Sequence, residues 1–332
     1  MGLNCKNILI TGGAGFIGSN YIMHIYQKYN DLKIINLDSL TYAGNTKNLD
    51  FIKDNHRYNF IKGNICDKNL VEELLKEYKI DGIINFAAET HVDNSISNPD
   101  VFVDTNINGT FNLLNNAYKY WMKGPFNFKT AFRNARFHQI STDEVFGSIS
   151  KGSFKESSKY APNSPYSASK AAADMLVRSF NKTFGLNTTI SISSNNFGPN
   201  QHNEKLIPKV INCLINNKSI PIYGDGKNIR DWIYVEEHCK AIEFIFNNSI
   251  AGESYNIGSG NEFTNIDLID LIEKIILQDK QVIKKIKFVK DRFGHDERYS
   301  LNTDKLKNEL GWKIENKFTE YLSNYIKTKY NE

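Results

Sequence analysis

The chain has 332 residues, of which 40% are apolar and 23% charged, as is usual for a globular protein of one large domain or two smaller ones. Its formal net charge of +4 is too small and too dispersed to indicate nucleic-acid binding. No apolar run approaches the roughly 20 residues that cross a membrane, and no signal-peptide pattern opens the sequence. The four cysteines lack metal-binding spacing, so we expect no metal site and a reducing, cytoplasmic location.

Short apolar runs alternate with amphipathic segments through the first half of the chain. The predicted strands are Asn7–Thr11, Lys33–Asp38, Tyr58–Lys62, Gly82–Ala87, Arg136–Ser141 and Thr188–Ile192. Apolar residues at helical spacing predict the helices Asp104–Trp121, Tyr166–Phe184, Glu204–Asn216 and Asn265–Leu277. The alternation is typical of βαβ units, and it predicts an α/β fold with a parallel sheet.

A glycine-rich turn follows the first predicted strand. Gly12, Gly15 and Gly18 allow a tight turn, a close approach of the backbone to a pyrophosphate and close packing of the following helix. The N-terminus of that helix would face the phosphates. Three glycines are a weak signal alone, because a glycine-rich turn without a ligand has the same sequence.

Asp38 strengthens the interpretation as a cofactor site, because it ends the second predicted strand about twenty residues beyond Gly18. A carboxylate there can bind both ribose hydroxyls and repels a 2′-phosphate, so we predict NAD and not NADP. The predicted fold is therefore a Rossmann-type doubly wound parallel sheet with a smaller C-terminal α/β domain. We place the NAD-binding domain at residues 1–190 and the substrate domain mainly at 191–332, with some segments returning to the first domain.

Tyr166 and Lys170 lie four residues apart, so they share one face of a predicted helix. A cationic Lys170 and the positive nicotinamide ring would lower the phenol pKa from about 10, so that Tyr166 can take a proton from an alcohol. Thr142, Asp143 and Glu144 follow the fifth predicted strand, at the sheet edge where α/β folds bind ligands. Unless they form a solvated turn, the two acids indicate a reaction beyond simple hydride transfer.

Motif blocks along nearly the whole chain resemble the nucleotide-sugar branch of the extended short-chain dehydrogenases, and in particular its 4,6-dehydratases. The blocks are residues 11–19, 37–45, 87–93, 141–147, 164–170, 194–199, 204–208, 230–232, 255–258 and 291–299. The Thr142-Asp143-Glu144 triplet is the most specific, because related epimerases and decarboxylases usually lack the paired acids.

The resemblance implies a lyase that converts dTDP-glucose into a 4-keto-6-deoxy sugar nucleotide and water, with tightly bound NAD recycled in each turnover. Tyr166 would take the 4-hydroxyl proton as C4 gives hydride to NAD, and Thr142 would hydrogen-bond the 4-oxygen. Glu144 would remove the C5 proton and Asp143 would protonate the departing 6-hydroxyl, before hydride returns to C6. The spacing alone does not assign these roles.

The resemblance also implies which residues surround the two ligands. The cofactor residues would be Gly12, Gly15, Phe16, Ile17, Gly18, Asp38, Leu40, Thr41, Asn64, Ile65, Ala87, Ala88, Thr105, Tyr166, Lys170 and Asn196. The substrate residues would be Thr90, His91, Thr142, Asn195, Lys205, Leu206, Pro221, Tyr223, Arg230, Asn265, Arg292 and His295. A homodimer is implied too, through a four-helix bundle of segments 104–121 and 166–184, although burial within one subunit would give the same apolar faces.

Three residues depart from the family pattern. Phe146 stands where Tyr is usual, Phe293 replaces a Pro beside Arg292, and Asn64 stands where an Asp commonly faces adenine. We expect the lost hydroxyl of position 146 to lie away from the reacting atoms. Phe293 can move Arg292, and the Asn64 carbonyl can still accept the adenine amine.

Other functions stay open at this point. UDP-glucose differs from dTDP-glucose in its base by one methyl group, so a UDP-glucose 4,6-dehydratase fits the same residues. A 4-epimerase or decarboxylase would use Tyr166 and Lys170 but leaves Asp143 and Glu144 without a role. A non-enzymatic NAD-binding regulator would be expected to lack some of these four residues.

Overall fold

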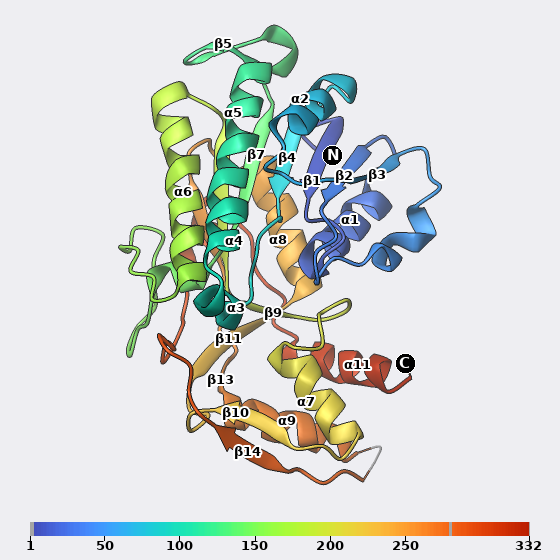
Figure 1. Cartoon of the computed structure of the whole chain (residues 1–332), viewed down its shortest axis with the longest axis vertical. Helices are drawn as coiled ribbons and strands as arrows, with labels where there is room; N and C mark the ends of the chain where they lie inside the picture. Colours follow the sequence, from blue (N-terminus) through green and yellow to red (C-terminus); the bar gives the residue numbers. More distant parts are fainter. Residues whose placement is uncertain (1–2, 279–280, 332) are drawn as a thin grey trace.

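A seven-stranded parallel sheet forms the centre of the larger lobe in the computed structural model, which describes residues 3–278 and 281–331 (Figure 1). The strand order is β12-β8-β7-β4-β1-β2-β3, and every neighbouring pair is parallel. The strands are β1 (Asn7–Thr11), β2 (Lys33–Asp38), β3 (Tyr58–Lys62), β4 (Gly82–Asn85), β7 (Arg136–Thr142), β8 (Thr188–Ser193) and β12 (Ser254–Ile257). The predicted α/β fold with a doubly wound parallel sheet is confirmed.

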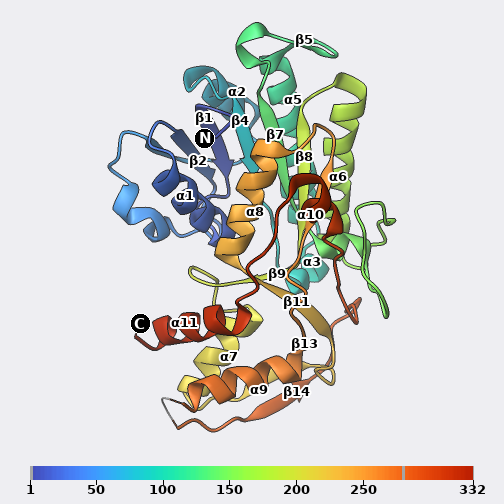
Figure 2. The same ribbon diagram turned by 180° about the vertical axis from the view of Figure 1, so that it is seen from behind.

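Helices cover both faces of this sheet. On one face lie α1 (Phe16–Lys28) and α8 (Val235–Asn248), and on the other lie α2 (Lys68–Glu77), α5 (Thr110–Trp121) and α6 (Pro165–Phe184) (Figures 1 and 2). The alternation of side chains along β1 explains the two cores, because Ile8 and Ile10 pack toward α1 and α8 whereas Leu9 packs toward α2 and α5. Both faces are buried, so β1, β2 and β4 contain runs of two or three apolar residues, whereas β7 and β8 mix apolar residues with buried polar ones such as His138 and Thr189.

The helix α6 has well-defined ends that fix the position of its first turn. The Ser164 side chain accepts the Ser167 N–H, the Ser167 hydroxyl accepts the Ser164 N–H, and Pro165 occupies the first helical position. Gly185, with φ +71°, ends the helix in the left-handed conformation. Tyr166 is thereby held at the helix N-terminus, beside the end of β7.

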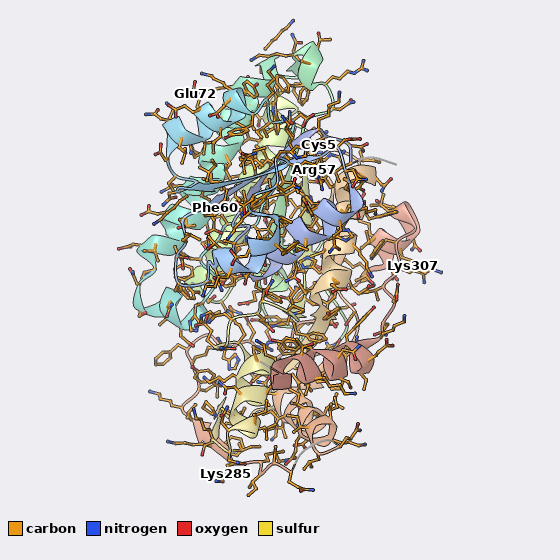
Figure 3. All side chains as sticks on the ribbon, turned by 90° about the vertical axis from the view of Figure 1, so that its right-hand side faces the viewer. Cys5, Arg57, Phe60, Glu72, Lys285 and Lys307 are labelled. Atoms are coloured by element: carbon orange, nitrogen blue, oxygen red, sulfur yellow. The ribbon has the colours of Figure 1, made fainter. Side chains whose placement is uncertain are left out.

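The smaller lobe has its own apolar core and two small sheets. One sheet pairs β10 (Ile220–Tyr223) with β14 (Ile286–Val289), and the other has the order β13-β11-β9. The remaining elements of this lobe are β9 (Asn195–Phe197), β11 (Ile229–Tyr234), β13 (Glu262–Thr264), α7 (Leu206–Ile215), α9 (Asn265–Ile276) and α11 (Phe318–Asn331). Figure 3 labels Lys285 at the tip of this lobe, at the end of the molecule opposite Glu72 on α2.

Several boundaries differ from the predicted ones. The segment Asp104–Trp121 divides into a π-helical stretch, Val103–Gly109, and α5. The strand β12, which was not predicted, joins the larger sheet from the C-terminal half of the chain. The helices α8 and α10 (Asp304–Leu310) also belong to the C-terminal half and lie on the larger lobe (Figure 2). The division at residue 190 stays a prediction; this residue lies within β8.

Short elements complete the fold. They are α3 (Val92–Ser97), α4 (Asp100–Phe102), β5 (Met122–Gly124), β6 (Asn127–Phe128) and single 3-10 turns such as Asp143–Phe146. Within the described part of the chain, no helix combines the length and the apolar character needed to cross a membrane.

Candidate active site

A cavity of about 1290 Å³ lies between the two lobes, at the carboxyl edge of the large sheet. Pockets for single small ligands measure about 300–1,000 Å³, so this one has room for two ligands side by side. Residues at the ends of β1, β2, β4, β7 and β8 line one part of it, and segments of the smaller lobe line the rest. All the predicted catalytic, cofactor and substrate residues line this cavity except Leu40.

The glycine-rich turn between β1 and α1 has the geometry of a dinucleotide site. A Cβ atom on Gly12, whose φ is +67°, would lie 2.7 Å from the Ala87 nitrogen. A Cβ on Gly18 would lie 2.4 Å from the Gly12 carbonyl oxygen. Gly15 directly precedes α1, and a Cβ there would meet a single atom within 4 Å, the Gly12 oxygen at 3.3 Å. Gly12 and Gly18 are therefore required by packing, whereas Gly15 leaves open space at the helix N-terminus.

Asp38 is buried at the end of β2 and holds two backbone segments. Its carboxylate accepts the Ala14 N–H at 2.9 Å and the Leu40 N–H at 2.8 Å. Burial raises the pKa of Asp38, and these two hydrogen bonds act in the opposite direction. Leu40 lies outside the cavity wall and has φ +54°, so it shapes the Asp38 site through its backbone. Each carboxylate oxygen keeps a lone pair for a further donor such as a ribose hydroxyl.

Asn64 lines the cavity, but its side-chain oxygen already has a protein partner. The Asn64 Oδ1 atom accepts the Cys66 N–H at 2.8 Å, which fixes the orientation of the amide. An adenine amine would therefore have to use the second lone pair of this oxygen. Ile65, Thr41 and Thr105 lie in the same cavity wall, as predicted for the cofactor site.

Tyr166 and Lys170 are both buried on α6. The Lys170 Nζ atom donates to the Ile140 carbonyl oxygen at 2.6 Å. Burial raises the pKa of Tyr166 well above its ordinary value of 10, and the Glu144 charge raises it further, whereas a Thr142 hydrogen bond lowers it. The predicted lowering of this pKa depends on Lys170 together with the nicotinamide ring, and it stays a prediction. In the chain's own groups burial disfavours the phenolate, and burial also lowers the pKa of Lys170, to about 8.

The two acids differ in their surroundings although they are adjacent in the 3-10 turn after β7. Asp143 is buried; Thr142 Oγ1 donates to its Oδ1 at 3.2 Å, and its Oδ2 has no partner among the residues that the structure describes. Burial, followed by the Glu144 charge, raises the pKa of Asp143 well above 3.8. Burial also raises the pKa of Glu144, and the charges of Arg230, Arg292 and Lys205 oppose this rise in part. Asp143 has the Glu144 charge beside it and Glu144 has more cations, a difference that favours the proton on Asp143.

Arg230 is buried on β11, and its charge lowers the pKa of both Asp143 and Glu144. Its guanidinium donates to the carbonyl oxygens of Ile229 at 2.8 Å and Asp296 at 2.9 Å. Its central carbon lies 4.2 Å from the centre of the Tyr299 ring. These partners are carbonyl groups and an aromatic ring, so they do not neutralise the guanidinium charge. Lys205, directly before α7, is a second cation in the wall, and burial lowers its pKa.

Arg292, His295 and Tyr223 form a linked group at the substrate side. The Arg292 guanidinium donates to His295 Nε2 at 3.2 Å, so the Nδ1–H of His295 donates to Asp291 at 2.7 Å. Burial, followed by the Arg292 charge, lowers the pKa of His295, in agreement with a neutral ring. Arg292 also lies 5.4 Å from the centre of the Tyr223 ring, whose hydroxyl donates to Asp93 at 3.1 Å. Tyr223 thereby joins the smaller lobe to α3 of the larger lobe.

The other predicted residues lie in the cavity wall, and their roles stay predictions. Asn196 Oδ1 accepts a hydrogen bond from His238 Nδ1 at 2.8 Å. His91 caps α3 by accepting the Asn94 N–H at 3.3 Å. The remaining members are Phe16, Ile17, Ala87, Ala88, Thr90, Asn195, Leu206, Pro221 and Asn265.

The positions that depart from the family pattern lie away from the reacting groups. Phe146 is buried outside the cavity wall, stacked on Phe154 with ring centres 5.0 Å apart. Phe293 is 74% exposed, and its neighbour Arg292 still lines the cavity. The substitution at 293 therefore does not remove the guanidinium from the site.

Further cavity residues were not predicted individually. They include Tyr42, Glu89, Asp93, Gln201, Glu204, Asp296 and Tyr299. Most of them belong to the motif blocks named in the sequence analysis, so membership of a block could have identified them as site residues. Glu204, for example, precedes Lys205, and its carboxylate lies 3.6 Å from His91 Nε2.

Comparisons with known proteins agree with this geometry. Residues 9–325 match the family model described as GDP-mannose 4,6 dehydratase. The chain is 46% identical to the dTDP-glucose 4,6-dehydratase of Haemophilus influenzae over 331 residues, or 97% of each chain. It is 45% identical to that of Salmonella typhimurium over 320 residues, 92% of this chain and 88% of the relative.

Solved structures give the same relationship. The dTDP-glucose 4,6-dehydratase of Streptomyces venezuelae, with NAD bound, superposes with a TM-score of 0.89 at 40% identity, covering 98% of this chain and 97% of the other. The UDP-glucose 4-epimerase of Thermotoga maritima superposes with a TM-score of 0.85 at 27% identity, covering 98% and 100%.

Proposed function

The chain belongs to the GDP-mannose 4,6-dehydratase family, and we propose that it is an NAD-dependent lyase that converts dTDP-glucose into dTDP-4-keto-6-deoxyglucose and water. One observation carries this proposal. Asp143 and Glu144 line the same cavity as Tyr166, and burial raises the pKa of both, with three cations acting in the opposite direction at Glu144. An epimerase or decarboxylase has no use for this pair, and relatives at 45–46% identity are named as dTDP-glucose 4,6-dehydratases.

The residues present fit NAD as the cofactor. Gly12 and Gly18 form a turn that a Cβ atom would fill, and Gly15 leaves room at the N-terminus of α1. Asp38 would bind the adenosine ribose, and Tyr166 with Lys170 would lie beside the nicotinamide. When bound, NAD takes the hydride from C4 of the glucose and returns it to C6 at the end of the cycle. Because the same molecule is restored in each turnover, we propose that it stays tightly bound.

The first proton transfer involves Tyr166. Its phenolate oxygen takes the proton of the 4-hydroxyl as C4 becomes a ketone, and Thr142 hydrogen-bonds the 4-oxygen. Because burial favours the neutral phenol, this step needs a positive charge beside the ring. Lys170, one helical turn away, is buried with its ammonium group on the Ile140 carbonyl and supplies that charge.

The elimination involves the two acids. The 4-ketone acidifies the C5–H bond, and the Glu144 carboxylate takes this proton. The C6–O bond then breaks while Asp143 gives its proton to the departing hydroxyl, which leaves as water. Glu144, whose proton exchanges with solvent, protonates C5 as C6 is reduced. Tyr166 then holds the proton of the 4-hydroxyl and Asp143 lacks the one it gave to water, so proton exchange through solvent returns both groups to their starting states.

The nucleoside diphosphate is held by the cations of the cavity. We propose that Arg230, Arg292 and Lys205 bind the pyrophosphate, since guanidinium groups suit bidentate phosphate contacts. Tyr223 and Pro221 would lie against the base, with Asn195, Asn265, Leu206, Thr90, His91 and His295 completing the substrate site.

Product analysis tests the proposal. Purified protein incubated with dTDP-glucose in deuterium oxide should form a base-labile 4-keto-6-deoxy sugar with deuterium at C5 and no net NADH. A simple C4 epimer, or an unchanged substrate, would contradict it. UDP-glucose is the parallel substrate: faster turnover of UDP-glucose would move the assignment to a UDP-glucose 4,6-dehydratase while leaving the chemistry in place.

We also propose a cytoplasmic homodimer formed through α5 and α6. Phe111 on α5 and Met175 on α6 are 47% and 49% exposed, which is unusual for large apolar side chains on neighbouring helices. Two copies that pair these helices would bury both side chains in a four-helix bundle.

A further inference from the structure

Asp174 is a fully buried acid that the proposed chemistry does not use. It lies on α6 four residues beyond Lys170 and eight beyond Tyr166, on the same helix face, and its side chain is 0% exposed. Its Oδ2 atom accepts the Ser141 hydroxyl at 2.5 Å and the Tyr160 hydroxyl at 3.1 Å. Its Oδ1 has no hydrogen-bond partner within the described residues. A buried carboxylate costs free energy unless it is compensated, so its presence here calls for a reason.

The contacts of Asp174 connect the helix that carries Tyr166 with the strand that carries the acids. Ser141 directly precedes Thr142 at the end of β7, and the carbonyl of Ile140 accepts the Lys170 ammonium at 2.6 Å. Two consecutive residues of β7 are therefore bonded to α6. One bond uses the carboxylate of Asp174 and the other the ammonium of Lys170.

The charges of Lys170 and Asp174 compensate each other inside the protein. Burial lowers the pKa of Lys170 to about 8, and the Asp174 charge acts in the opposite direction. Burial raises the pKa of Asp174 to about 6, and Lys170 is the leading group that lowers it, followed by Ser141 and Tyr160. Without the carboxylate, the ammonium group would be a buried cation with a backbone carbonyl as its hydrogen-bond acceptor.

We propose that Asp174 is a positioning residue for the proton transfer at Tyr166: its charge keeps Lys170 in the ammonium form, and its hydrogen bond to Ser141 holds the end of β7 against α6. The inference rests on the proposed function, because it assigns Asp174 a part in the same proton transfer. Asp174 lies outside the cavity wall, so it acts through Lys170 and Ser141 and not on the substrate.

The other charged groups around this face determine the sign of the expected effects. Glu144 and Asp143, from the turn after β7, raise the pKa of Tyr166, and so does Asp174. Arg178, one turn beyond Asp174, acts on Tyr160. Removal of the Asp174 charge therefore lowers the pKa of both Lys170 and Tyr166. The rate requires the Lys170 ammonium group. Without the Asp174 charge, the rate should therefore begin to fall at a lower alkaline pH than in the wild type.

The test compares pH profiles of kcat for dTDP-glucose in the wild type, Asp174→Asn, Tyr160→Phe and the exposed control Asp54→Asn. In Asp174→Asn the alkaline limb should move to lower pH by about 1–3 units, while KM stays within about twofold. In Tyr160→Phe the Asp174 carboxylate remains, but it loses a hydrogen-bond donor that lowers its pKa. The acid limb of the profile should therefore move to higher pH. Asp54→Asn should leave both limbs in place.

Three outcomes separate the possibilities. An unmoved alkaline limb in Asp174→Asn, or a rate that falls equally at every pH, overturns the proposal, because a merely structural acid would behave in this way. If Asp174→Asn does not fold, an unchanged acid limb in Tyr160→Phe overturns it instead. A wild-type protein that forms no keto sugar would count against the proposed function, and the variants are compared only after wild-type turnover is measured.

Discussion

The Asp38 carboxylate accepts the backbone N–H of Ala14 at 2.9 Å, so the acid that ends β2 is held against the glycine-rich turn that follows β1. The two features that predicted NAD are thus parts of one hydrogen-bonded unit. The second oxygen of the carboxylate accepts the Leu40 N–H, which fixes the rotamer of Asp38. A ribose bound at this position would meet an oriented charge.

Replacement of Asp38 by Ala should weaken NAD binding by about 10–100-fold, because a hydrogen bond to a charged group contributes about 1.5–3 kcal/mol. The preference for NAD over NADP should shrink, since the charge that repels a 2′-phosphate is lost. Titration of both cofactors measures the two dissociation constants. Asp31→Ala, at an exposed aspartate, is the matched control. A variant that keeps a strong preference for NAD would contradict the role of Asp38.

Glu144→Gln and Asp143→Asn should separate the steps of the reaction. Each should reduce elimination by about 10²–10⁴-fold, the usual contribution of a positioned acid or base, while the initial oxidation at C4 is affected far less. Rapid-mixing absorbance at 340 nm reports the oxidation, and deuterium uptake at C5 reports proton removal. Equal losses in the two steps would remove the assignment of these acids to the elimination.

The acid side of the pH profile should depend on the cations that face Glu144. Burial raises the Glu144 pKa and Lys205 lowers it, so Lys205→Gln should raise it further. A base must be ionised to act, and the deuterium exchange at C5 should therefore decline at a higher pH in this variant than in the wild type. Lys209→Gln replaces another cavity lysine, one turn along α7, as the control. An identical acid limb in the wild type and Lys205→Gln would refute the electrostatic argument.

Glu243 should stabilise the packing of α8 on α1. Burial alone would raise its pKa, but hydrogen bonds from His24, Lys28 and Tyr29 lower it to about 2. Because the folded-state pKa lies below the ordinary 4.5, this stabilisation is fully present above pH 4.5 and is lost as the pH falls toward 2. Urea unfolding should show Glu243→Gln less stable by about 1.5–3 kcal/mol at pH 7, with a smaller difference at pH 3. The exposed Glu73→Gln should not change stability.

Met175→Glu should weaken the proposed dimer, because it would place a charge in the apolar centre of the helix bundle. Sedimentation over a range of concentrations should show the monomer appearing at higher concentration than in the wild type. Ile250→Glu changes a side chain that is 69% exposed but distant in sequence from α5 and α6, and it should leave the association unchanged. Equal association of Met175→Glu and the wild type would exclude this face as the interface.

Much of the fold followed from local patterns. All six predicted strands are present, because a strand buried on both faces leaves a continuous apolar run such as Asn7–Thr11. The strand β12 was missed because Ser254–Ile257 is short and pairs with β8 across more than sixty residues of chain. The π-helical stretch at Val103–Gly109 was also missed, because its hydrogen bonding is not encoded by the apolar spacing.

Most of the predicted site residues line one cavity, but their roles stay predictions, and the sequence indicates little about the electrostatics of the site. Leu40 lies outside the wall although its neighbours line the cavity, because its backbone conformation serves Asp38. The sequence predicts that Lys170 and the nicotinamide ring lower the Tyr166 pKa, but it does not indicate that burial raises this pKa. Sequence spacing places two side chains on one helix face, but it does not report how much water either side chain loses.

By itself the sequence determined the parallel α/β architecture, the glycine-rich turn, Asp38 and the pairing of Tyr166 with the two acids, because these depend on residue type and local spacing. Only the tertiary structure decided which groups compensate the buried charges. Asp174 meets Ser141 and Tyr160 across separate elements, and Arg230, Arg292 and Lys205 converge on Glu144 from three segments of the smaller lobe. The pKa of a buried group depends on its desolvation and on the charges around it, and both are set by packing between residues far apart in the chain.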